Sequence, residues 1–217
     1  MRSVLLFIFD LDGTLVNTIE DITASVNFTL ARLGSPPLPS ERVRRYVGDG
    51  IEELMRRSLS GTTERLSDAV TIYKEHHRRN LVVRSRLYPG VLETLDYFKP
   101  LSLSIISNKA TEFVEPLISR LGIAGYFDSV IGADLGLPLK PAPDAVLKVL
   151  SDSGVPKEQT VMVGDGTTDI RAGKAAGVMT CAVTYGFRSE DELRPAGPDF
   201  MVHSFSELKD LFIAGKQ

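Results

Sequence analysis

The chain begins with an uncharged apolar run that leads directly into two aspartates. Residues 4–9 are Val, Leu, Leu, Phe, Ile and Phe, and Asp10-Leu11-Asp12-Gly13-Thr14 follows. Such a run is typical of a strand buried on both faces, as strands of parallel sheets are. Residues two apart in an extended strand point to the same side, so both carboxylates are expected in one small volume. That volume lies at the strand's C-terminal end, where open α/β sheets bind their ligands.

Two neighbouring carboxylates repel each other unless a cation or a shared proton compensates their charge. The pair Asp10 and Asp12 therefore indicates a metal site. The alternative is that both aspartates only form a turn, with Gly13 supplying the turn geometry. The rest of the chain must decide between these two interpretations.

The composition is that of an ordinary globular protein. The chain has 217 residues, of which 43% are hydrophobic and 24% charged, and its formal net charge is -3. Its single cysteine, Cys181, excludes an internal disulfide and is consistent with a reducing compartment. The N-terminal apolar run is too short for a signal peptide or a membrane-spanning helix. We therefore expect a cytoplasmic protein without a membrane partner, and no dense basic run suggests a nucleic-acid partner.

The segment after the two aspartates is predicted to be helical. Apolar residues at helical spacing predict a helix over residues 18–33, with Thr18 as its N-cap and Gly34 at its end. Further helices are expected from Ser40, over residues 51–59, and from Thr63 to about Val83. Residues 17–84 are therefore predicted to form an all-helical insertion.

From residue 88 onward, predicted helices and strands alternate. Strands are expected over residues 101–106, 127–131 and 160–163, around Cys181, and near residues 200–202. The helices between them are expected over residues 91–98, 111–121, 145–150 and 170–176, with a last helix from Ser206. This alternation predicts a doubly wound, Rossmann-like α/β core with a parallel sheet, formed by residues 1–16 and 85–217.

Polar residues that could take part in a binding site occur at three further places in this core. Ser107 and Asn108 come after one strand, where a hydroxyl beside backbone N–H groups suits a phosphate oxygen, and Ser107 is also expected to cap the next helix. Lys140 lies in a proline-rich loop and could face phosphate, although a solvated lysine is the simpler interpretation. Asp165 and Asp169 follow the strand over residues 160–163, where both could serve only to start a helix. Acidic clusters after two separate strands favour a shared site.

These four segments, in this order, resemble the four motifs of the haloacid dehalogenase superfamily of phosphatases. The motifs are Asp10-Leu11-Asp12-Gly13-Thr14, Ser107-Asn108, Lys140-Pro141 and Gly164-Asp165-Gly166-Thr167-Thr168-Asp169. The helical insertion is similar to that family's C1 cap. Segments 46–51, 87–91 and 185–188 resemble the phosphoglycolate phosphatase branch. Gly166 departs from the pattern, since many members have serine there.

The resemblance implies a hydrolase that works through an aspartyl-phosphate. Asp10 would be the nucleophile, and Asp12 would protonate the leaving oxygen and later activate water. Mg²⁺ would be held by the carboxylates of Asp10 and Asp165 and the main-chain carbonyl of Asp12. Ser107, Asn108 and Lys140 would bind the phosphoryl oxygens, and Asp169 would orient Lys140 or a metal-bound water.

The implied substrate is a small phosphorylated metabolite, with 2-phosphoglycolate the first choice. An inorganic pyrophosphatase or a broad sugar-phosphate phosphatase of the same family is the alternative. A phosphoacceptor signalling domain also uses clustered aspartates, Mg²⁺ and a lysine, but such domains usually lack a helical cap of this length. The chain is expected to be a monomer or a homodimer.

Overall fold

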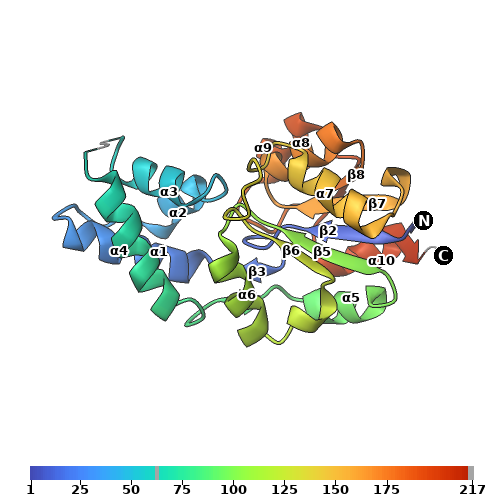
Figure 1. Ribbon diagram of the computed structural model, residues 1–217, viewed down its shortest axis with the longest axis horizontal. Helices are drawn as coiled ribbons and strands as arrows, with labels where there is room; N and C mark the ends of the chain where they lie inside the picture. Colours follow the sequence, from blue (N-terminus) through green and yellow to red (C-terminus); the bar gives the residue numbers. More distant parts are fainter. Residues whose placement is uncertain (62–63, 215–217) are drawn as a thin grey trace.

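A six-stranded parallel sheet forms the centre of the molecule (Figure 1). The structure is a computed structural model that describes residues 1–61 and 64–214. The strand order is β6-β5-β2-β7-β8-β9. The strands are β2 (Leu6–Phe9), β5 (Ser102–Ile106), β6 (Ser129–Ile131), β7 (Thr160–Gly164), β8 (Met179–Val183) and β9 (Phe200–Val202). The predicted doubly wound parallel sheet is therefore confirmed.

Helices cover both faces of this sheet. The helices are α5 (Val91–Phe98), α6 (Thr111–Arg120), α7 (Asp144–Ser153) and α8 (Thr167–Ala176). On β2, Leu6 and Ile8 belong to the apolar cluster that includes residues of α7 and α8. Phe7 and Phe9 belong to the cluster on the other face, with residues of α5 and α6. Because both sets of β2 side chains are buried, the strand contains no polar residue until Asp10.

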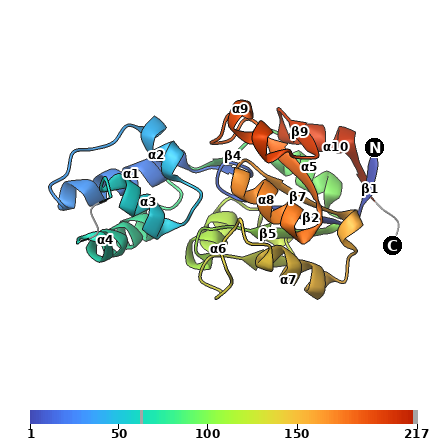
Figure 2. The same ribbon diagram turned by 90° about the horizontal axis from the view of Figure 1, so that it is seen from above.

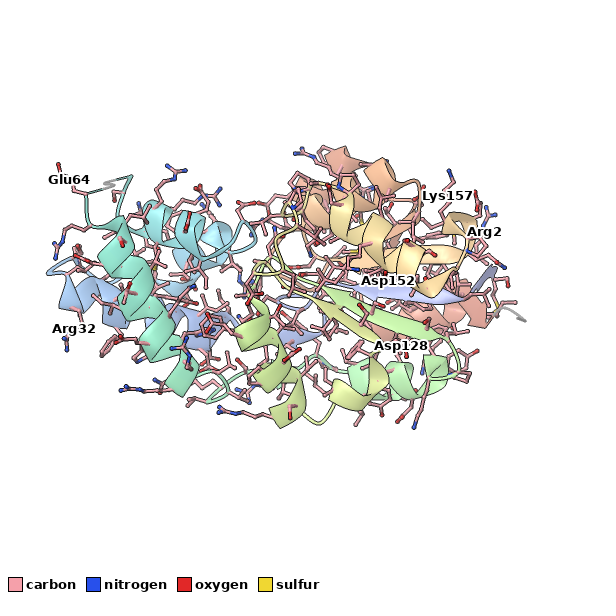
Figure 3. The ribbon with its side chains drawn as sticks, viewed as in Figure 1. Arg2, Arg32, Glu64, Asp128, Asp152 and Lys157 are labelled. Carbon is pink, nitrogen blue, oxygen red and sulfur yellow. The ribbon has the colours of Figure 1, made fainter. Side chains whose placement is uncertain are left out.

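Four further helices pack together at one end of the molecule (Figures 1 and 2). They are α1 (Ile19–Arg32), α2 (Ser40–Tyr46), α3 (Ile51–Ser58) and α4 (Leu66–Arg79), and we refer to them as the cap. The cap has an apolar cluster of its own, built from residues such as Ile22, Leu54 and Tyr73. Figure 3 shows Arg32 and Glu64 at the far end of the cap, Arg2 and Lys157 at the opposite end of the molecule, and Asp152 on the core between them.

Two short strands connect the cap to the sheet. Strands β3 (Val16–Asn17) and β4 (Arg86–Leu87) form an antiparallel pair, so the outgoing and returning chains lie side by side. Asp21 is buried in the first turn of α1 and accepts hydrogen bonds from the backbone N–H groups of residues 83, 84 and 85. This carboxylate therefore fixes the returning chain against the helix that leaves the sheet.

The remaining elements are short. They are β1 (Arg2–Val4), β10 (Phe212–Ala214), α9 (Glu190–Leu193), α10 (Leu208–Leu211), and the 3₁₀ turns at Ala124–Tyr126, Lys157–Gln159, Arg194–Ala196 and Phe205–Glu207. In the described part of the chain, the helices are too short or too polar to cross a membrane.

Three predicted elements differ from the structure. The first strand is divided at Leu5, because residues 2–4 leave the central sheet and pair with β10. The helix expected from Thr63 begins at Leu66 and ends at Arg79, since Asp21 binds the chain after it in a non-helical form; Thr63 itself lies outside the described residues. The helix expected from Ser206 has only one turn before the chain becomes β10.

Candidate active site

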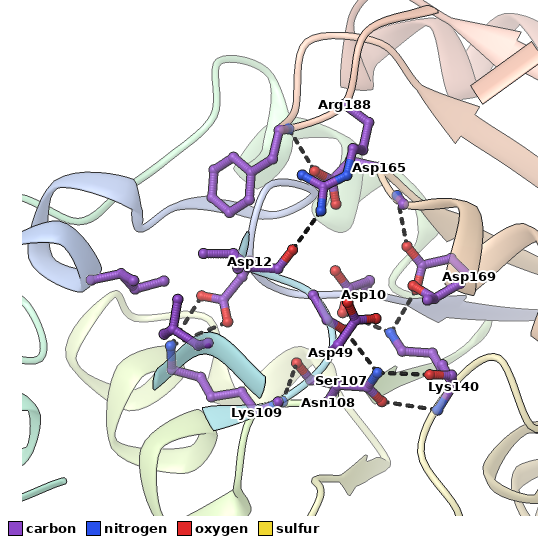
Figure 4. A pocket seen from close by; sticks show the side chains of 18 of the residues that line it. Asp10, Asp12, Asp49, Ser107, Asn108, Lys109, Lys140, Asp165, Asp169 and Arg188 are labelled. Atoms are coloured by element: carbon purple, nitrogen blue, oxygen red, sulfur yellow. Dashed lines mark hydrogen bonds and ion pairs between the residues drawn. The ribbon is translucent and has the colours of Figure 1, made fainter. Parts of the chain in front are cut away.

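Three carboxylates from two strand ends meet at the C-terminal edge of the sheet (Figure 4). Asp10 follows β2, Asp165 follows the neighbouring strand β7, and Asp169 lies in the first turn of α8. One oxygen of each lies within 4.8 Å of the others, and all three residues are buried. The register of β2 and β7 forces Asp10 and Asp165 together, because Phe9 is paired with Val163.

Lys140 compensates part of this negative charge. Its Nζ lies 2.8 Å from an oxygen of Asp10 and 2.7 Å from an oxygen of Asp169, and it donates to the carbonyl of Ile106 at 2.7 Å. The side chain is only 2% exposed. The sequence left open whether this lysine is a solvated loop residue; the structure places it within the acidic cluster.

Glycines leave just enough room for Asp165. A Cβ on Gly13 would lie 2.1 Å from an oxygen of Asp165, and a Cβ on Gly186 would lie 2.3 Å from its Cβ. Gly13 also has a φ of +91°, which side chains disfavour. The N–H of Phe187 donates to Asp165 at 2.6 Å, so the loop after β8 fixes the carboxylate from the opposite side.

Burial and mutual repulsion alter the titration of the cluster. Burial raises the pKa of Asp10 to about 7; Lys140 opposes the shift, and the charges of Asp169 and Asp12 add to it. Burial, followed by the charges of Asp10 and Asp169, also raises the pKa of Asp165 well above its usual value. Burial disfavours the charged form of Lys140, but Asp10 and Asp169 outweigh it and raise the pKa of the ammonium.

The donor set suits a divalent metal ion. The three carboxylates carry three negative charges when ionised, and the ammonium of Lys140 balances one of them. A hard cation bound by carboxylate oxygens would relieve the remaining repulsion. The elevated pKa values of Asp10 and Asp165 have this excess of negative charge as one cause. The residues present therefore fit a divalent metal ion.

Asp12 directs its carboxylate away from this cluster (Figure 4). Lys109 Nζ donates to both of its oxygens, at 3.1 and 3.2 Å, and the hydroxyl of Thr18 donates to one of them at 2.6 Å. Thr18 precedes α1 as predicted, but its side chain makes no capping bond to the helix. Its hydroxyl binds Asp12 instead, which connects the start of the cap to the site.

Ser107 and Asn108 follow β5 and line the same pocket. The amide of Asn108 donates to the carbonyls of Lys140 and Gly48 and accepts from the N–H of Lys140. Ser107 does not cap the next helix, because α6 begins at Thr111, and Asp134 accepts from its first N–H groups. The Ser107 hydroxyl accepts from the N–H of Lys109 at 3.2 Å. The structure thus brings all seven predicted site residues to one pocket.

The sequence did not identify several residues that also line this pocket. Lys109 is buried, and its position directly after Ser107-Asn108 at a strand end was the one signal available. Tyr73, Asp49 and Arg188 line the pocket from the cap and from the loop after β8. Asp49 and Arg188 lie in segments 46–51 and 185–188, which the sequence singled out by resemblance without giving either residue a role, and Tyr73 is revealed only by the packing of the cap.

The other candidate chemical groups lie outside the site. Cys181 is buried in β8, and burial raises the pKa of its thiol, which does not suit a nucleophile. His77 packs against Tyr73 and Phe113, and His203 contacts Thr184. Cys181, His77 and His203 are not among the residues that line the pocket.

Comparison with known proteins places this architecture in a family. Residues 7–183 match the family model described as "Haloacid dehalogenase-like hydrolase". The chain is 35% identical over 212 residues to phosphoglycolate phosphatase 1 of Pseudomonas aeruginosa, covering 94% of this chain and 78% of the relative. It is 34% identical over 214 residues to phosphoglycolate phosphatase of Nitrosococcus oceani, covering 95% of each.

The fold comparison agrees with the sequence comparison. The crystal structure of a predicted phosphoglycolate phosphatase from Haemophilus somnus superposes with a TM-score of 0.92 at 29% identity, covering 97% of this chain and 99% of that one. The chain therefore belongs to the haloacid dehalogenase-like hydrolases, among which it is a phosphatase similar to phosphoglycolate phosphatases.

Proposed function

We propose that the protein is a Mg²⁺-dependent phosphomonoester hydrolase whose substrate is 2-phosphoglycolate. The observation that carries the chemistry is the buried group Asp10, Asp165 and Asp169 with Lys140 at 2.7–2.8 Å. The names of the relatives, which match over nearly the whole chain, support the substrate. The octahedral oxygen coordination that Mg²⁺ prefers supports the choice of ion.

In the first step, a carboxylate oxygen of Asp10 attacks phosphorus, and the bond from phosphorus to the leaving oxygen breaks. Asp12 gives a proton to that oxygen, which leaves as the neutral hydroxyl group of glycolate. Lys109 and Thr18, which hold the Asp12 carboxylate at 2.6–3.2 Å, orient this acid. They act on the reaction through Asp12.

Three polar groups bind the phosphoryl oxygens during the transfer. Lys140 supplies a positive charge, and Ser107 and Asn108 supply hydrogen-bond donors. The side-chain amide of Asn108 uses both of its N–H groups on the carbonyls of Gly48 and Lys140, so the donor that Asn108 offers to phosphate is its main-chain N–H. Asp169 positions Lys140 rather than contacting substrate.

In the second step, water attacks the phosphorus of the aspartyl-phosphate. Asp12, now ionised, removes a proton from that water, and the bond from phosphorus to the Asp10 oxygen breaks. Phosphate leaves, and both aspartates return to their initial states. When bound, the divalent ion would be held by Asp10, Asp165 and the main-chain carbonyl of Asp12, and it would neutralise phosphoryl charge.

We further propose that residues 17–84 act as a cap domain over a core of residues 1–16 and 85–217. The separate apolar cluster of α1–α4 and the paired connections β3 and β4 support this division. A cytoplasmic location and a monomeric or homodimeric state stay predictions from the sequence.

A panel of phosphate compounds tests the proposed substrate. The purified protein with Mg²⁺ is assayed for phosphate release from 2-phosphoglycolate, several sugar phosphates and inorganic pyrophosphate, and kcat/KM is compared. We expect 2-phosphoglycolate to exceed the other compounds at least about tenfold, since one favourable contact is worth this much. A flat profile would indicate a broad sugar-phosphate phosphatase, and a preference for pyrophosphate would indicate a pyrophosphatase.

A further inference from the structure

The loop of residues 185–188, between β8 and α9, connects the metal-site carboxylates to the cap. At its start, the hydroxyl of Tyr185 donates to the carbonyl of Thr14 at 2.8 Å. In its middle, the Phe187 N–H donates to Asp165 at 2.6 Å. The proposed reaction gives the last two side chains of this loop, Phe187 and Arg188, no role. Both side chains point toward the cap.

Phe187 is part of the apolar cluster of the cap rather than that of the sheet. It is 7% exposed and is buried in one cluster with residues of α1, α3 and α4. The guanidinium of Arg44, in α2, lies 5.9 Å from the centre of its ring. A segment that starts at a central strand therefore ends inside the cap.

Arg188 binds the C-terminal end of helix α2. Its guanidinium donates to the carbonyls of Arg44 at 2.9 Å, Arg45 at 3.3 Å and Val47 at 2.7 Å. The last carbonyls of a helix have no partner within the helix and carry partial negative charge. The planar, charged fork of an arginine suits several such acceptors at once. Arg188 thus supplies from the core the capping group that α2 does not provide itself.

A second contact reaches the same part of the cap. The amide of Asn108 donates to the carbonyl of Gly48, the residue next to Val47. The ends of β5 and β8 therefore both bind the loop that follows α2. Asn108 is also assigned to the phosphoryl group, so a variant there would change two functions. Arg188 also lines the pocket, but the proposed reaction assigns it no group to bind, so it is the better position for a test.

We propose that Arg188 is a positioning residue that holds the cap closed over the catalytic pocket. Because its acceptors are backbone carbonyls, the contact does not depend on the side chains of α2. When the cap moves away from the sheet, these hydrogen bonds break together. The loop that carries Arg188 also holds Asp165, so the closed cap and the orientation of this carboxylate support each other.

The test measures the distance between cap and core directly. Cysteines replace the exposed residues Arg32 in the cap and Asp152 in the core, and both receive spin labels; Cys181 is fully buried. Distributions of the distance between the two labels are recorded by pulsed electron paramagnetic resonance, with Mg²⁺ and inorganic phosphate present. We expect one narrow distribution in the otherwise unchanged protein. In Arg188→Ala we expect a broader distribution that extends to longer distances.

Matched variants separate the proposed role of Arg188 in holding the cap closed from a general effect of its charge. Arg188→Lys keeps the charge but not the fork, so its distribution should be intermediate. Arg171→Ala removes an exposed arginine from α8 and should leave the distribution unchanged. Without the distance labels, kcat/KM for 2-phosphoglycolate should fall about 10- to 100-fold in Arg188→Ala, recover partly in Arg188→Lys, and stay unchanged in Arg171→Ala.

An Arg188→Ala protein whose cap keeps the original distance distribution would overturn the proposal. Circular dichroism confirms that each variant is folded, and Arg188→Gln carries the same test if the alanine variant is unfolded. The distance measurement uses phosphate rather than phosphoglycolate. It therefore stays decisive for the proposed role of Arg188 even if the substrate panel contradicts the proposed function.

Discussion

The sheet and the cap contribute different kinds of groups to one pocket. The sheet contributes charged side chains from strand ends, above all Asp10, Asp165 and Lys140, whose positions follow from strand register. The cap contributes apolar side chains such as Ile22 and Leu54, and backbone carbonyls that accept bonds from the core. The charged groups of the pocket are therefore concentrated at the sheet, and the cap covers them with apolar side chains and backbone. Changes in the two regions should have effects of different kinds.

The largest expected effect is that of removing the nucleophile. Asp10→Asn keeps the volume of the side chain but removes the attacking oxyanion, so kcat should fall by about a thousandfold or more. The fold should be kept, because the substitution removes one negative charge from a buried cluster of carboxylates that repel one another. Phosphate release from 2-phosphoglycolate measures the loss, and Asp152→Asn, at an exposed position of α7, is the matched control. Substantial turnover by Asp10→Asn would exclude its assigned role.

Removal of the metal should have the next largest effect. Excess EDTA should abolish turnover, and Mg²⁺ in excess of the chelator should restore it, since the carboxylates then regain their counter-charge. Full activity in EDTA would rule out the metal proposal.

The same cluster predicts how metal stabilisation depends on pH. The pKa of Asp10 is raised to about 7 in the folded protein, above its unfolded value of 3.8. The metal-free fold therefore favours the protonated form and loses stability as pH rises from about 4 to 7. Mg²⁺ should raise the melting temperature more at pH 8 than at pH 5. An equal increase at both pH values would contradict this account of the cluster.

Replacing Lys140 tests how far the stability of the core depends on the charged residues of the site. Lys140→Met leaves Asp10 and Asp169 buried without their cation, so the free energy of unfolding should decrease by about 3–5 kcal/mol. Urea denaturation measures this change, and turnover should be lost as well. Lys148→Met removes an exposed partner of Asp152 and should change stability by less than about 1 kcal/mol. Similar losses of stability in both variants would mean that the buried ion pairs of Lys140 contribute no more to the free energy of unfolding than an exposed ion pair.

A smaller effect is expected for His77 in the cap, on the pH dependence of stability. Burial, followed by the charges of Lys109 and His76, lowers the pKa of His77 to about 2. The fold favours the neutral ring, so this stability is present above pH 6.5 and is lost as pH falls. Between pH 6.5 and 4.5 the loss should reach about 2–3 kcal/mol. Urea denaturation of His77→Gln should lack this component of the pH dependence.

His203 provides the control for the pH experiment. It is exposed and contacts Thr184 in the core, so His203→Gln should keep the pH dependence of the unmodified protein. If His77→Gln and the unmodified protein lose stability in parallel as pH falls, the neutral form of His77 is not what stabilises the cap.

The sequence predicted the core more completely than the cap contacts. Asp10 and Asp165 could be found because each follows an uncharged strand, and the parallel sheet brings such ends together. Lys140 could be placed only by resemblance, since the loop that carries it has no regular structure. The parallel sheet and the helical insertion followed from hydrophobic periodicity alone.

Most contacts that the sequence missed connect segments far apart in the chain; the bond between Thr18 and Asp12, six residues apart, is the exception. Thr18 looked like an ordinary N-cap, and nothing local indicates that its hydroxyl binds Asp12. Asp21 lies in the first turn of α1, where acidic residues are common, and nothing local indicates that it holds residues 83–85 of the returning chain. Arg188 binds carbonyls more than 140 positions away. Such contacts depend on how cap and core pack, which periodicity does not encode.

The account depends most directly on Asp10 as the acceptor of the phosphoryl group. Radiolabelled 2-phosphoglycolate is mixed with the enzyme and Mg²⁺, the reaction is quenched with acid within one turnover, and the protein is digested. We predict that the label appears on the peptide containing Asp10 and is absent from the Asp10→Asn protein. Rapid phosphate release without label on that peptide at any time within the turnover would contradict the account.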